Sequence, residues 1–86
     1  MSLRREAQID QEVAEVMAEL ARRFGATANE TVEDIVERAA VFGDPVALVM
    51  SEVPPDGLTE LEFKEHTLRR LREAKTVWRE ADQYQN

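Results

Sequence analysis

The most apolar part of the chain is AAVFGDPVALVMSEV, residues 39–53, and the break inside it sets the course of the helices on either side. Ten of these fifteen residues are apolar, and only Asp44 and Glu52 carry charge. Gly43 is typical of a helix end, while Asp44 followed by Pro45 is typical of an N-cap and a first helical position. The sequence therefore predicts a helix of about two turns, from Pro45 to about Glu52. It is apolar on every side and needs cover on every side.

A long helix is predicted ahead of this segment. It begins a few residues after Ser2 and ends near Phe24, where Gly25 supplies a left-handed cap. Glu6 and Asp10 fall within its apolar arc, so its first two turns are predicted to protrude or fray. Spacings of three and four place its apolar residues on one face, which is directed toward the core. This face comprises Ile9, Val13, Val16, Met17, Leu20, Ala21 and Phe24.

A shorter helix is predicted between that helix and Gly43. Thr31 with Asp34 three residues later is an approximate capping box, and Asn29 is an alternative start. Together with the helix after Pro45, it makes a compact acidic hairpin. The apolar stripe of the helix before Gly43 holds Val32, Ile35, Val36, Ala39 and Phe42.

The strongest loop signal is PPDG, residues 54–57, which no helix crosses. Thr59 and Glu62 then form a capping box for a long final helix that reaches Ala81 or beyond. We therefore predict an all-α fold, a small four-helix domain whose long first and last helices frame the short acidic hairpin. Residues 1–86 form one domain with flexible ends at 1–5 and 83–86. The final helix's apolar arc holds Phe63, Leu71, Ala74, Val77, Trp78, Ala81 and Tyr84, with Leu61 and Leu68 to one side.

Size and composition limit what this domain can do. A chain of 86 residues buries roughly 60–65% of its unfolded surface, so a second copy or a partner would help to stabilise it. The absence of cysteine excludes disulfides and thiolate chemistry. The longest apolar run, Val46 to Met50, is far shorter than the roughly 20 residues of a membrane span. We expect a soluble, cytoplasmic protein with no membrane partner and no cofactor.

The net charge of -7 is concentrated in the middle of the chain. Residues 1–25 carry four basic and five acidic side chains, residues 26–58 one and seven, and residues 59–86 six of each. The most apolar segment is therefore also the most anionic. This combination is typical either of a recognition surface with a polar rim or of an acidic solvated face around an ordinary core.

A helix-turn-helix cadence runs from Ile35 to Glu52, with Gly43 in the turn. A DNA-reading helix needs basic or amide side chains, and this segment offers apolar ones in a chain of pI about 4.7. We therefore expect no nucleic-acid partner and interpret the cadence as a tight helix corner.

His66 is the only histidine, and Glu62 precedes it by one helical turn. With Glu73 these residues suggest a small helical metal-dependent enzyme, which we keep as a second alternative. Metal sites need three or four ligands at defined spacing, and no nucleophile motif is present. We expect neither a metal nor enzymatic activity, and a histidine at the edge of the packed face that interacts with Glu62 or Glu73.

Charged residues of the final helix raise two further expectations. Arg70 falls inside the apolar arc and must either extend to solvent or find a carboxylate. A basic stripe either makes solvated ion pairs or meets the acidic middle segment, from the same or a second chain. It comprises Lys64, Arg72, Lys75 and Arg79, with Arg69 near its edge.

The first functional expectation is a non-enzymatic protein–protein interaction module, such as an adaptor, assembly factor or small regulatory subunit. It self-associates, most simply as a dimer, or docks on a partner protein through its apolar 41–53 region. The alternative is an acidic decoy that occupies a basic surface of a target. The candidate interface residues are Val41, Phe42, Val46, Val49, Met50, Val53, Arg70, Trp78 and Tyr84.

Overall fold

A computed structural model describes residues 2–84, which form four helices and no strand. They are α1 (Ser2–Arg23), α2 (Val32–Val41), α3 (Pro45–Met50) and α4 (Glu60–Gln83). The described part of the chain is 74% helical, and the predicted all-α class with long first and last helices is confirmed. Residues 1, 85 and 86, which belong to the predicted flexible ends, lie outside the described residues. None of the helices within residues 2–84 is both long enough and apolar enough to cross a bilayer.

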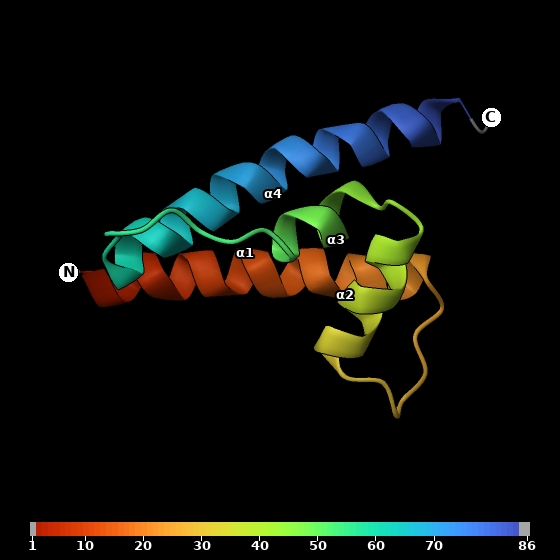
Figure 1. The fold of residues 1–86 in the computed structure, drawn as a ribbon, viewed down its shortest axis with the longest axis horizontal. Helices are drawn as coiled ribbons and strands as arrows, with labels where there is room; N and C mark the ends of the chain where they lie inside the picture. Colours follow the sequence, from red (N-terminus) through yellow and green to blue (C-terminus); the bar gives the residue numbers. More distant parts are fainter. Residues whose placement is uncertain (1, 85–86) are drawn as a thin grey trace.

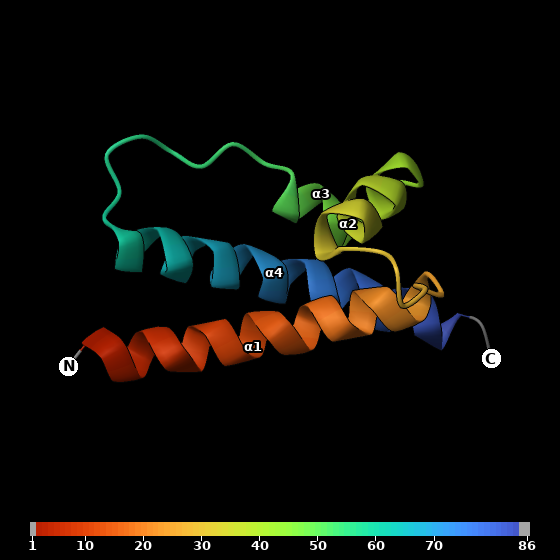
Figure 2. The same cartoon turned by 90° about the horizontal axis from the view of Figure 1, so that it is seen from below.

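The helices lie in two layers. In Figures 1 and 2, α1 and α4 run alongside each other, and α2, α3 and the loop after α3 lie on one face of this pair. The two short helices lie toward the C-terminal halves of α1 and α4. The N-terminal halves therefore form a part of the α1–α4 layer that neither short helix covers.

Local signals place the starts of α2 and α4 and the end of α2 where the sequence predicted them. Thr31 and Asp34 form a complete capping box, so Asn29 is not the cap of α2. Thr59 and Glu62 form a second box at the start of α4. Gly43 has φ +78°, a left-handed conformation that residues with a side chain rarely adopt.

The helix α3 is shorter than predicted, because it ends at Met50 instead of near Glu52. Ser51 caps it, and its hydroxyl donates a 2.9 Å hydrogen bond to the carbonyl of Ala47. All residues from 51 to 60 are exposed.

One core joins all four helices. Asp44 connects two of them by accepting hydrogen bonds from the amides of Val46 and Ala47, at 2.9 and 3.0 Å, and from the indole Nε1 of Trp78 at 2.8 Å. The core consists of Val16, Leu20, Ile35, Ala39, Val46, Ala47, Leu71, Ala74 and Trp78.

The predicted apolar arc of α4 is wrong at one edge. Leu68, placed to one side by the helical wheel, is 1% exposed, whereas Phe63 and Val77 are 42% and 48% exposed. The reason is that α4 packs against α1 as well as α3, so the buried arc is shifted toward α1.

The first turns of α1 do not fray as their sequence suggested. Ile9 is 1% exposed, and the helix is continuous from Ser2. The carboxylate of Asp10 lies 3.1 Å from the Lys64 ammonium, and Arg5 forms an ion pair with Glu65. A partner on α4 thus accommodates the charge of Asp10, which interrupts the apolar face.

Candidate protein-interaction surface

Two of the predicted interface residues lie inside the core. Val46 is 0% exposed and Trp78 is 5% exposed, so both hold the fold together and neither is available to a partner. Arg23 further covers Trp78, with its guanidinium carbon 4.4 Å from the centre of the indole ring. The short helix α3 is therefore covered on one face by its own chain.

Four of the predicted residues lie on the surface. Val41 and Phe42, which we call the α2 end, are 84% and 76% exposed, and Val53 and Tyr84 are each 90% exposed. Val49 and Met50 are half-buried. The sequence analysis did not select Leu48, which is 48% exposed on α3. The all-round apolar character of this helix was the signal that could have identified it.

The α2 end is held in a defined position. The amides of Phe42 and Asp44 both donate to the carbonyl of Ala39, each at 3.1 Å, and the Phe42 ring lies 6.1 Å from the ring of Phe24. These bonds connect the end of α2 directly to the start of α3. Val41 and Phe42 are therefore exposed apolar side chains on a rigid support.

A groove of about 400 Å³ lies between α3 and α4. Leu48, Val49 and Val77 are among its apolar lining residues. Arg70, also in the lining, forms ion pairs with Glu52 at 2.6 Å and Glu73 at 2.8 Å. The expectation that Arg70 finds a carboxylate is confirmed.

The basic stripe of α4 pairs mainly with α1. Lys64 pairs with Asp10, and Arg72 Nε lies 2.7 Å from a Glu12 carboxylate oxygen. Within residues 2–84, the ion pairs between α4 and the acidic middle segment involve Arg70 and none of the stripe residues. The alternative in which the stripe meets that segment within one chain is therefore wrong.

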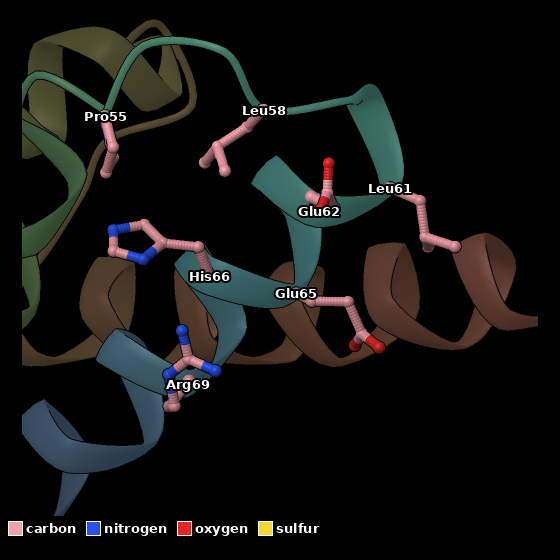
Figure 3. A pocket seen from close by; sticks show the side chains of 7 residues that line it. All are labelled: Pro55, Leu58, Leu61, Glu62, Glu65, His66 and Arg69. Carbon is pink, nitrogen blue, oxygen red and sulfur yellow. The ribbon is translucent and has the colours of Figure 1, made fainter.

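The candidate metal ligands do not converge. His66 lines a pocket of about 380 Å³ with Pro55 and Leu58 of the loop (Figure 3). Glu62 accepts the Thr59 amide hydrogen bond at 2.9 Å, and Glu73 forms an ion pair with Arg70. Within residues 2–84, no group of three or more acidic, histidine or cysteine side chains is placed to hold a metal ion.

Glu65 lines the same pocket, but its carboxylate is engaged outside it. Figure 3 shows its carboxylate directed toward α1, where Arg5 donates to it. His66 lies beside the aliphatic loop residues at the edge of the packed face, as the simpler interpretation of the sequence expected. The expected interaction with Glu62 or Glu73 is wrong, because Glu62 bonds to Thr59 and Glu73 to Arg70.

Acidification is expected to weaken the contact between α1 and α4. Hydrogen bonds from Arg72 and Arg5 hold the pKa values of Glu12 and Glu65 below their usual 4.5. A carboxyl whose pKa is lowered by folding contributes stability above its unfolded pKa, and this is lost as the pH falls through the folded value. The melting temperature should thus be nearly constant from about pH 7 to pH 5 and fall below about pH 4.5.

Circular dichroism melts across this range would measure the effect, which is modest because these pairs are exposed. Glu12→Gln removes one of the titrating groups and should flatten the decline. A melting temperature that rises on acidification below pH 4.5 would contradict this account.

Comparisons with protein-family models, with curated proteins and with solved structures give no match to this chain.

Proposed function

We propose that this protein is a non-enzymatic protein-interaction module that self-associates or docks on another protein through the exposed apolar part of segment 41–53. Its contact residues are Val41, Phe42, Leu48 and Val53. The observation that carries the proposal is the 84% and 76% exposure of Val41 and Phe42 at a rigid helix end. A cytoplasmic location belongs to the same proposal and is supported by the absence of cysteine.

Covering the exposed apolar side chains of the α2 end with a partner is energetically favourable. Covering apolar area contributes about 25 cal/mol per Å², and aromatic side chains are frequent anchors of protein interfaces. The backbone hydrogen bonds that fix the α2 end reduce the entropy lost on docking. Phe42 therefore has the chemistry and the support of an interface anchor.

Phe42→Ser is expected to weaken association about 30-fold, because it removes the aromatic anchor. Its effect on the free energy of unfolding should stay within about 0.5 kcal/mol, since the ring is mostly in solvent. Light scattering over a hundredfold range of concentration measures self-association. Leu3→Ser is the matched control, because Leu3 is 78% exposed on the distant first turn of α1.

A strictly monomeric wild-type chain would exclude the self-association form of the proposal. The effect of salt distinguishes self-association from docking on a basic protein. A symmetric contact brings two acidic segments together and should strengthen with salt, whereas docking on a basic protein should weaken. Equal association of the Phe42→Ser variant and the wild type would overturn the assignment of the α2 end.

A second candidate, the acidic decoy, is favoured by the exposed carboxylates of α2. Glu33 and Glu37 are exposed and make no ion pair within residues 2–84. A decoy would bind a basic protein with steep salt dependence and tolerate Phe42→Ser, whereas Glu33→Gln with Glu37→Gln would weaken it. The interaction module predicts instead that Phe42→Ser weakens binding more than Glu33→Gln with Glu37→Gln does.

A further inference from the structure

A second apolar groove lies beyond Met50, the C-terminal end of α3. It measures about 340 Å³, and we call it the α1–α4 groove. Phe63 in its wall is 42% exposed, and Ala14 is exposed as well. The α1–α4 groove is lined by Ile9, Asp10, Val13 and Ala14 of α1, Met50 of α3, and Phe63, Lys64 and Thr67 of α4.

The groove is open because α3 stops early. α3 ends at Met50, and the chain then continues as an exposed loop in which Val53 is 90% exposed. Figure 2 shows this loop bending away from the N-terminal half of α4, on the same side as α3. None of residues 51–59 is among the lining residues of the groove, so the loop leaves it open.

The walls of the groove favour a helix as the occupant. They are helices whose backbone groups are already bonded, and Thr67 is the only uncharged polar side chain in the lining. An extended peptide would leave its own amides and carbonyls unpaired there, whereas a helix satisfies them internally. The helix α3 already packs on the same face of the α1–α4 pair, directly beside the groove.

The charge at the rim favours a basic occupant. Asp10, with smaller contributions from Glu6 and Glu60, raises the pKa of Lys64 above 10.5. Glu6 lies one helical turn before Asp10 on α1, and Glu60 lies one turn before Lys64 on α4. Neither glutamate forms an ion pair within residues 2–84, so carboxylates outnumber ammonium groups at this end of the groove. A lysine or arginine at the corresponding end of a bound helix would complement them.

We propose that the α1–α4 groove binds a basic amphipathic helix of another protein, with the apolar face of that helix against Val13, Met50 and Phe63. This site goes beyond the proposed function, because it uses neither Val41 nor Phe42. A second copy is a poor occupant, because its net charge is also -7 and the rim of the groove is negative.

Fluorescence anisotropy with a labelled synthetic peptide tests the proposal. The probe is a helix-forming peptide with a leucine face and flanking lysines, and its matched peptide has glutamate at every lysine position. The lysine peptide should bind at least about tenfold more tightly, with an affinity that falls as salt is added. Equal binding of the two peptides would overturn the proposal.

Protein variants locate the site. Ala14→Lys places bulk and positive charge in the groove at an exposed helical position, and should weaken peptide binding about tenfold. Gln11→Lys is the control, because it adds the same charge to an exposed position of α1 outside the lining. It should change affinity less than about twofold, and equal weakening by both variants would overturn the site.

Two further measurements distinguish binding in the α1–α4 groove from binding elsewhere on the protein. Shifts of the Val13 and Met50 methyl resonances on peptide addition support the groove, whereas shifts confined to Val41 contradict it. Phe42→Ser should leave peptide binding unchanged, so failure of the α2-end proposal does not imply failure of this one. Self-association that Ala14→Lys abolishes would identify a second copy as the occupant and overturn the proposal.

Discussion

Asp44→Ala is expected to lower the free energy of unfolding by about 2–4 kcal/mol. The Asp44 carboxylate is the N-cap of α3 and also accepts the Trp78 indole hydrogen bond at 2.8 Å. Loss of a cap alone costs about 1 kcal/mol, and leaving buried donors unpaired costs about 1–3 kcal/mol more. For a domain of this size, this is a large part of the total stability.

Urea unfolding monitored by the fluorescence of Trp78 measures this loss. Thr31→Ala is the matched control, since Thr31 caps α2 at an exposed position and should cost only about 1 kcal/mol. A double-mutant cycle with Trp78→Phe, followed by circular dichroism because this variant has no tryptophan, should give a coupling of about 1–2 kcal/mol. Equal losses from Asp44→Ala and Thr31→Ala would show that the indole bond adds nothing.

Leu71→Ala is expected to destabilise the domain by about 2–5 kcal/mol. Leu71 is 0% exposed in the core that joins the four helices, so the truncated side chain leaves a cavity that rigid helices only partly close. Thermal unfolding should show a fall in melting temperature of roughly 10–30 °C.

Leu3→Ala provides the comparison, because Leu3 is 78% exposed. The same chemical change there should alter the free energy of unfolding by no more than about 0.5 kcal/mol. A loss below about 1 kcal/mol for Leu71→Ala would contradict the described core.

The helix ends could be predicted from the sequence because neighbouring residues determine them. A capping box needs only Thr59 and Glu62, and the start of α3 needs only Asp44 and Pro45. The burial of Leu68 could not be predicted in the same way. It depends on α1, which packs against a second side of α4, and a helical wheel of α4 alone does not show where its neighbouring helices lie.

The candidate surface was predictable only in part. Apolar side chains marked segment 41–53, but Val46 is buried while Phe42 is mostly in solvent, and composition does not distinguish the two. The α1–α4 groove was missed entirely. Its lining comes from three helices distant in sequence, so no local pattern brings Ile9, Met50 and Phe63 together.

The exposed loop between α3 and α4 divides the domain into two parts, α1–α3 and α4, which are held together mainly by the packing between them. Apart from the helix caps at Ser51 and Thr59 and the Glu52–Arg70 ion pair, residues 51–59 contribute mainly chain continuity, because all of them are exposed. α4 is held by the face that it buries against α1 and α3. Cutting the chain within this loop would remove a tether whose entropic value depends only weakly on its length. The fragments carrying α1–α3 and α4 would then be natural binding partners of each other.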